Sequence, residues 1–173
     1  VFVARTDLDI EGLEGLQGKT FTFGSESSTS GHLMPRYFLI QAGIDPEKDF
    51  QNAPGFSGSH DKTWKLVESG TFQAGALGES IWESAVEGNR VDLSEVQAIY
   101  TTPAYYNYNW TIRGDVDETF GDGFTGRVQA ALLAMDSEQR EILDMFQTDR
   151  FIESGNQNYR NIDDVARNLD IIR

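Results

Sequence analysis

Three consecutive hydroxyl side chains, Ser28, Thr29 and Ser30, lie in a stretch of small residues that runs from Gly24 to Gly31. Hydroxyl groups and free backbone N–H groups together can donate several hydrogen bonds without a fixed charge. Such donors suit a tetrahedral oxyanion where the stretch leads into a helix, because the first N–H groups of a helix have no partner within it. The alternative is a plain helix N-cap, since serine and threonine are common in that position.

The residues on either side of this first donor loop predict a strand before it and a helix after it. Phenylalanine alternates with threonine over Lys19–Phe23, which is the period-two pattern of a strand. After the loop, apolar residues recur every three or four positions until Gly43, a suitable helix C-cap. Pro35 removes a backbone hydrogen bond near the start of that helix, so we expect a loose or kinked first turn.

A second donor loop, Ser57–Asp61, contains His60 and follows an expected strand over Phe50–Phe56. Further expected strands and helices alternate along the centre of the chain. This alternation is typical of an α/β fold with a mostly parallel sheet flanked by helices. Ligands of such sheets bind at the carboxyl ends of the strands, where both donor loops lie, so we expect one binding site there. These further elements are strands over Phe72–Leu77 and Val96–Thr101 and helices over Asp61–Ser69 and Gly78–Val86.

The two ends of the chain have a different pattern. Val1–Arg5 is a short β-type run, and the aromatic segment Tyr105–Ile112 has high β-propensity. The last third of the sequence predicts only helices, over Gly126–Met135, Ser137–Gln147 and Ile162–Ile172.

Composition restricts the classes of partner. Apolar residues make up 39% and aromatic residues 12% of the 173 residues, which indicates a folded globular chain. The formal net charge of −14 argues against nucleic acid or an anionic membrane as partner, but not against a small anion held by a few local donors. The absence of cysteine excludes disulfides and thiolate chemistry. No spacing of His, Asp and Glu indicates a metal site, and we expect no cofactor.

Other polar and aromatic residues near the expected site have simpler interpretations. A lone histidine at a helix start, such as His60, is usually a surface or capping residue. Beside the first donor loop, however, it could donate a hydrogen bond to the same oxyanion. Asp61 suits the positive end of a helix dipole, and His32 is expected on a helix surface. Glu79 is compatible with a cleft or with solvent. The aromatic residues Tyr105, Tyr106, Tyr108 and Trp110 are expected in core or hinge packing, with at most one contacting ligand.

The sequence resembles the periplasmic phosphonate-type substrate-binding proteins of ABC importers over essentially its whole length. It is most similar to members linked to phosphonate, phosphite or selenate uptake. The resemblance implies that Ser28, Thr29 and Ser30 form the anion-binding loop and that His60 contacts the ligand. The segments that carry it are Leu16–Phe21, Ser28–Pro35, Ala42–Phe50, Phe56–Asp61, Ala74–Ala76 and Thr102–Trp110.

The resemblance also implies a domain organisation. The family fold has two α/β lobes joined by two crossing strands, with the ligand between them. This chain is too short for both lobes, so we expect a fragment that lacks most of the first lobe and associates with itself. The expected parts are a crossing strand and lead-in (1–18), a second lobe of the periplasmic-binding-protein type II class (19–104), a return strand and loop (105–125) and C-terminal helices (126–173).

The expected function is therefore that of a solute-binding component, which captures a small oxyanion in the bacterial periplasm and delivers it to a membrane permease. One alternative is the effector-sensing domain of a regulator. A second, weaker alternative is a hydrolase that uses a serine of the first donor loop with His60 as its base. No Gly-x-Ser-x-Gly motif is present, and no acidic partner is positioned by a motif.

The resemblance also bears on ligand choice. Relatives that bind aminoalkyl phosphonates carry a carboxylate in the return segment, where it can pair with the ammonium group of the ligand. The match over Thr102–Trp110 places Asn107 at this position. Asparagine can form hydrogen bonds but has no charge, so we expect a preference for ligands without an amine.

Overall fold

The computed structural model describes residues 1–170 and 172. These residues form two compact units, which we call the sheet unit (Val1–Tyr105 with Arg160–Arg173) and the helical unit (Tyr106–Tyr159). The expected division into a second lobe and C-terminal helices of a first lobe stays a prediction.

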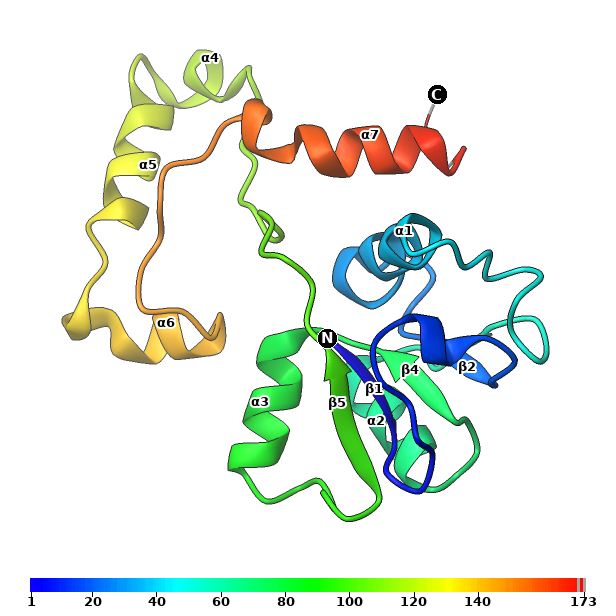
Figure 1. Cartoon of the computed structure of the whole chain (residues 1–173). Coiled ribbons are helices and arrows are strands. Elements are labelled where there is room, and N and C mark those ends of the chain that lie inside the picture. The colour runs from blue at the N-terminus through cyan, green and yellow to red at the C-terminus, as the bar shows by residue number, and fades with distance from the viewer. Residues whose placement is uncertain (171, 173) are drawn as a thin grey trace. The chain divides into compact units, whose positions relative to one another are not determined.

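The sheet unit contains a five-stranded sheet in the order β3-β2-β4-β1-β5 (Figure 1). β2 pairs in parallel with β3 and with β4, whereas β1 pairs antiparallel with β4 and with β5. β1 is therefore the strand that runs against the other four, and the expected mostly parallel sheet is confirmed. The strands are β1 (Phe2–Arg5), β2 (Phe21–Phe23), β3 (Gly55–Phe56), β4 (Ala74–Ala76) and β5 (Val96–Tyr100).

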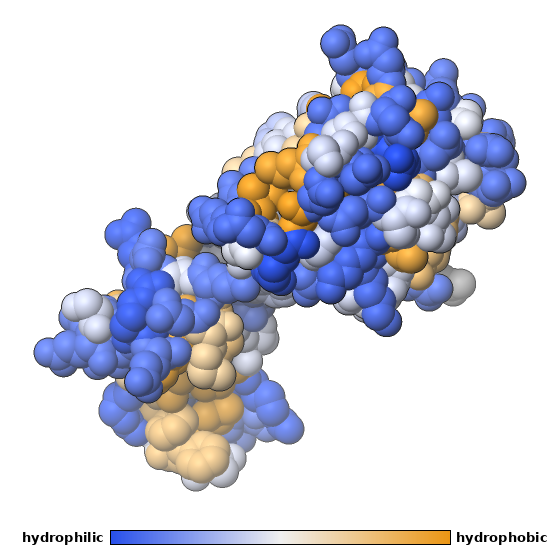
Figure 2. Space-filling model, turned by 90° about the horizontal axis from the view of Figure 1, so that it is seen from below, coloured by the Kyte–Doolittle hydropathy of each residue, from blue (hydrophilic) through white to orange (hydrophobic). Residues whose placement is uncertain are grey.

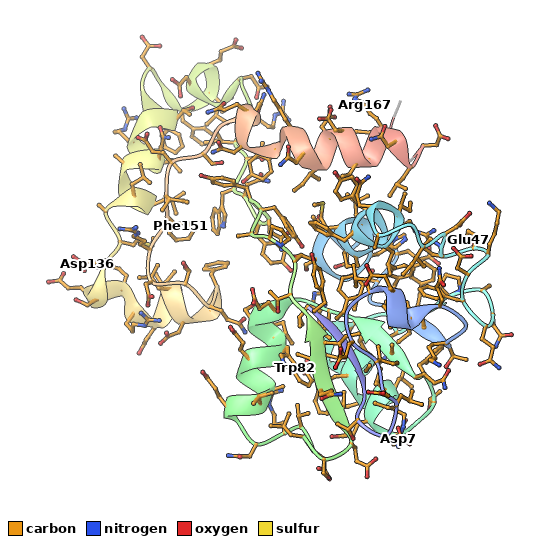
Figure 3. All side chains as sticks on the ribbon, in the orientation of Figure 1. Asp7, Glu47, Trp82, Asp136, Phe151 and Arg167 are labelled. Atoms are coloured by element: carbon orange, nitrogen blue, oxygen red, sulfur yellow. The ribbon has the colours of Figure 1, made fainter. Side chains whose placement is uncertain are left out.

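Helices cover both faces of this sheet because its strands are apolar on both faces. In β1 and the residue before it, Phe2 and Ala4 belong to one buried cluster, whereas Val1 and Val3 belong to another. The first cluster includes residues of α1 and of the turn η1, and the second includes residues of α2 and α3. Trp82 of α3 is part of this second cluster (Figure 3). These elements are η1 (Glu14–Leu16), α1 (Met34–Gln41), α2 (His60–Glu68) and α3 (Glu79–Glu87).

Gly75, in the middle of β4, allows α2 to approach the sheet closely. A Cβ atom on Gly75 would lie 2.8 Å from Thr63 Cγ2 of α2 and 2.9 Å from the backbone oxygen of Thr22 in β2. Separations below 3.0 Å are not tolerated, and one of these atoms belongs to the backbone. The small residues of β4 thus fix the position of α2, whose first residue is His60.

Two expected strands differ from the structure. The strand expected over Phe50–Phe56 is reduced to β3, because Pro54 has no N–H for a ladder and the preceding residues form bends. Phe50 is instead buried and stacks on Phe21, with ring centroids 4.7 Å apart. In the part of the chain that the structure describes, the segment Tyr105–Ile112 forms no strand, so its high β-propensity does not by itself produce one.

The helical unit contains α4, α5, η3, α6 and η4, and residues 106–159 hold one buried side chain, Leu143. The turn before α6 is capped by Asp136, which forms a capping box with Gln139. α4 was not expected from the sequence. These elements are α4 (Val116–Phe120), α5 (Phe124–Leu133), η3 (Ser137–Gln139), α6 (Arg140–Met145) and η4 (Asn156–Tyr159).

The last helix, α7 (Arg160–Asn168), belongs to the sheet unit and is close to α1. Arg167, labelled in Figure 3, pairs with Asp163 one turn earlier at 2.9 Å. The helix expected over Ile162–Ile172 is thus present in part, and Ile171 lies outside the described residues. Among residues 1–170 and 172, none of the helices has the length and apolar character needed to cross a membrane.

Candidate anion-binding site

The carboxyl ends of β2, β3 and β4 lie at the same edge of the sheet because these strands are parallel. Each strand is followed by a short loop and then by a helix: β2 by the turn η2 (Thr29–Leu33) and α1, β3 by α2, and β4 by α3. Three helix N-termini therefore begin at this edge, and their first N–H groups and positive dipole ends favour an anion. Both donor loops lie where the sequence predicted.

The first donor loop is closed by its own hydrogen bonds. Ser28 is the N-cap of η2, and its Oγ accepts a hydrogen bond from the Gly31 N–H at 3.0 Å. The Gly24 N–H donates to the Gly31 carbonyl oxygen at 2.7 Å. η2 is a π-type turn, which gives way to α1 with Pro35 in its first turn. The loose first turn is confirmed, and it leaves the Ser28 hydroxyl hydrogen and the Thr29 and Ser30 hydroxyls as donors.

Close packing of glycine brings the first donor loop against His60. A Cβ atom on Gly31 would lie 3.0 Å from Ser28 Oγ, 3.1 Å from His60 Cε1 and 3.2 Å from the Gly24 Cα. Residues from two separate donor loops therefore meet at Gly31. The structure brings Ser28, Ser30 and His60 together, as the expected site requires.

His60 is held in one tautomer. Its Nδ1 accepts a hydrogen bond from the Gly78 N–H at 3.0 Å, so in the neutral ring the hydrogen is on Nε2. Burial lowers the pKa of the His60 imidazole below its ordinary value, which favours the neutral ring at neutral pH. Ser59 caps the helix that His60 begins, accepting a hydrogen bond from the Lys62 N–H. His60 therefore offers one N–H donor, from Nε2, and no formal charge.

His32 has a different role from the expected surface position. It is half-buried, its Nδ1 lies 2.7 Å from the Glu26 carbonyl oxygen, and its Nε2 accepts a hydrogen bond from Arg36 at 2.9 Å. The ring also lies 4.8 Å from the Phe23 ring. Burial lowers the pKa of His32, so the neutral ring is favoured here too.

The hydrogen bonds of His32 to Glu26 and to Arg36 link the middle of the first donor loop to α1. Arg36 also pairs with Glu47 at 2.7 Å and lies over the Phe23 ring. The i, i+4 spacing of His32 and Arg36 on a helix was the available sequence signal for it.

The remaining candidates are exposed or belong to the other unit. Asp61 is exposed and pairs with Arg90 at 3.3 Å, as expected for a helix-terminal charge, and Glu79 is exposed. Asn107 is half-buried in the helical unit, so its part in the site stays a prediction.

The aromatic residues of the helical unit pack against one another. The Tyr106 ring lies 6.0 Å from that of Tyr159, and the Trp110 ring lies 5.4 Å from Phe146 and 5.7 Å from Phe151. Phe151 is labelled in Figure 3. The expected core packing is wrong for Tyr106, Tyr108 and Trp110, which are exposed, although Tyr106 and Trp110 contact other rings.

Comparisons with known proteins identify the family of the chain. A sequence model of the family described as "ABC transporter, phosphonate, periplasmic substrate-binding protein" matches residues 1–159. A relative described as the probable ABC transporter phosphite binding protein PhnD1 of Prochlorococcus marinus (strain MIT 9301) is 43% identical over 182 residues. This alignment covers 100% of the present chain but 61% of the relative, so the chain spans less than two thirds of that protein.

Solved structures agree with this relationship. The structure of PhnD1 from Prochlorococcus marinus (MIT 9301) in complex with methylphosphonate matches with a TM-score of 0.90 and 43% identity, over 99% of this chain and 66% of that chain. A binding protein component of an ABC phosphonate transporter from Pseudomonas aeruginosa matches with a TM-score of 0.70 and 19% identity, over 95% of this chain and 55% of that chain, which shows the shared fold. The resemblance found in the sequence is thus confirmed, and the chain belongs to the family of periplasmic phosphonate-binding proteins of ABC transporters.

Proposed function

We propose that the protein carrying this chain is the solute-binding component of an ABC importer. It captures a small tetrahedral oxyanion of the phosphonate, phosphite, phosphate or selenate class in the periplasm and releases it to a membrane permease. The observation that carries the proposal is the meeting of Ser28, Ser30 and the Nε2–H of His60 where three helices begin. Thr29 lies in the same turn and adds a third hydroxyl.

The orientation of His60 argues against the hydrolase alternative. A general base must accept the hydroxyl proton of serine on an unprotonated ring nitrogen. Nδ1 of His60 is occupied by the Gly78 N–H, so Nε2 carries the hydrogen and can donate but cannot accept. This tautomer suits the recognition of an anion. Family membership likewise favours import over the sensing domain of a regulator.

One competition experiment tests both the class of ligand and the proposed role of Asn107. We propose that Asn107 influences ligand choice and disfavours an amine, because a buried ammonium without an ion partner is costly. In competitive binding on the full-length protein, phosphite, methylphosphonate and selenate should bind more tightly than 2-aminoethylphosphonate. Asn107→Asp should improve binding of the aminated ligand and weaken that of the others.

Asn109→Asp is the matched control, since Asn109 is an exposed asparagine of the same segment. Its effect should be small for every ligand. Tightest binding of 2-aminoethylphosphonate by the unchanged protein, with no gain from Asn107→Asp, would contradict the assignment of Asn107. A protein that binds none of these four anions and no phosphate would contradict the proposed function itself.

We also propose that the 173-residue chain associates with itself when it is produced alone. Large apolar side chains of the helical unit are exposed, and Figure 2 shows orange apolar atoms at the molecular surface. Exposed apolar patches favour association. Light scattering at increasing protein concentration should show a rising mass, and a constant monomer mass would contradict the proposal. The most exposed of these residues are Tyr108, Trp110, Phe120, Met145 and Ile152.

A further inference from the structure

Gly78 lies between β4 and α3, at the edge of the sheet where the donors meet. It is buried and is the N-cap of α3, with φ −66° and ψ 132°. Any residue can adopt these angles, so the backbone conformation does not require glycine. Its N–H donates to His60 Nδ1 at 3.0 Å, which places the remaining ring hydrogen on Nε2.

A side chain at position 78 would point toward the donors Ser30 and His60. A Cβ atom on Gly78 would lie 3.6 Å from Ser30 Oγ, 3.6 Å from His60 Nε2 and 3.6 Å from His60 Cε1. These are ordinary van der Waals separations, so the fold would tolerate a methyl group. The same methyl group would, however, occupy space beside both donors. A ligand oxygen that accepts from them must come within about 3.2 Å of each.

Gly78 differs from Gly31 and Gly75 in the space around its would-be Cβ atom. A Cβ atom on Gly75 would lie 2.9 Å from a backbone oxygen, so close packing of the fold requires glycine there, and a Cβ atom on Gly31 would lie 3.0 Å from Ser28 Oγ, which would have to shift. Gly78 has neither a steric conflict with the fold nor a strained backbone. Its lack of a side chain therefore leaves room at the position of the ligand and has little effect on the packing of the fold.

We propose that Gly78 is a positioning and specificity-determining residue of the anion site. Its N–H holds His60 in the tautomer that donates from Nε2, and its lack of a side chain keeps room for the anion beside Ser30 and His60. This inference rests on the proposed function, because it assigns Gly78 a part in the same site.

The test compares Gly78→Ala with Gly126→Ala in the full-length protein. Gly126 lies in α5 with no atom within 4 Å of its would-be Cβ, so the same methyl group is added there without a contact. Binding of phosphite and of methylphosphonate is measured by calorimetry, thermal unfolding by the midpoint temperature, and the His60 tautomer by nitrogen-15 NMR of the imidazole.

We expect Nε2-protonated His60 in the unchanged protein and in Gly78→Ala, since alanine keeps the backbone N–H. Gly78→Ala should lose affinity for both anions by about tenfold or more. Its midpoint temperature should fall only slightly, because alanine replaces glycine at the N-cap of α3, whereas that of Gly126→Ala should rise slightly, because the methyl group is added inside α5. Gly126→Ala should bind as the unchanged protein does.

Three outcomes would overturn the inference. They are unchanged affinity of Gly78→Ala, a hydrogen on Nδ1 of neutral His60 in the unchanged protein, and a fall in the midpoint temperature so large that Gly78→Ala is partly unfolded at the temperature of the titration. If the unchanged protein binds neither anion nor selenate, the proposed function fails and this inference fails with it. Binding by the unchanged protein with any of the three outcomes refutes the role of Gly78 alone.

Discussion

Replacing Ser28 and Thr29 together by alanine should weaken oxyanion binding by the full-length protein by about 3–6 kcal/mol, which corresponds to roughly 10²–10⁴-fold. Each hydroxyl is expected to donate a hydrogen bond to a charged oxygen, and such bonds are worth about 1.5–3 kcal/mol each. Calorimetric titration with phosphite and methylphosphonate measures the loss. Unchanged affinity would mean that the first donor loop serves only to cap η2.

Ser28 has a structural role that must be separated from ligand binding. Its Oγ accepts the Gly31 N–H, and alanine at an N-cap costs about 1 kcal/mol of stability. Glycine at an N-cap costs only about a few tenths of a kcal/mol. Ser28→Gly with Thr29→Ala should therefore lose as much affinity as the double alanine variant with less loss of stability.

A second pair of hydroxyls provides the matched control. Ser69 and Thr71 are exposed at the C-terminal end of α2, with their hydroxyl oxygens 3.0 Å apart. Alanine at both positions removes the same groups far along the helix from its N-terminus. Affinity should then remain as in the unchanged protein, whereas an equal loss would indicate that the effect is not specific to the first donor loop.

Much of the sheet unit could be predicted because local patterns agreed with the tertiary structure. Alternating phenylalanine and threonine gave β2, the small residues of Ala74–Ala76 gave a buried central strand, and the order of elements gave the mostly parallel sheet. The two donor loops followed from the same order, since each lies after a parallel strand. The family resemblance supplied the proposed roles of Ser28–Ser30 and His60, which no single motif establishes.

The features that could not be predicted depend on contacts between distant residues. The hydrogen bond from Gly78 to His60 spans 18 positions, and its direction decides the tautomer of the ring. The bond from His32 to Glu26 requires the loop to fold back on the start of the helix. Tyr105–Ile112 has the composition of a strand but forms none within the described residues, and propensity alone does not produce one.

Phe21 is the side chain whose removal should cost the sheet unit most. It is 1% exposed, in the middle of a cluster where its ring lies 4.7 Å from Phe50, 5.0 Å from Phe23 and 6.1 Å from Phe2. Phe21→Ala removes these contacts and leaves a cavity that the surrounding strands cannot fill, which costs about 3–5 kcal/mol. Unfolding in urea, followed by a probe in the sheet unit, measures the change.

Leu93→Ala is the control, because Leu93 belongs to the same unit and is 54% exposed. Its cost should stay within about 0.5 kcal/mol, as for other surface positions. A loss below about 1 kcal/mol for Phe21→Ala, far under the cost of a large core cavity, would mean that the aromatic cluster rearranges to fill the space. Because Phe21 lies in β2 directly before the first donor loop, the variant should also bind oxyanions less tightly, whereas Leu93→Ala should not.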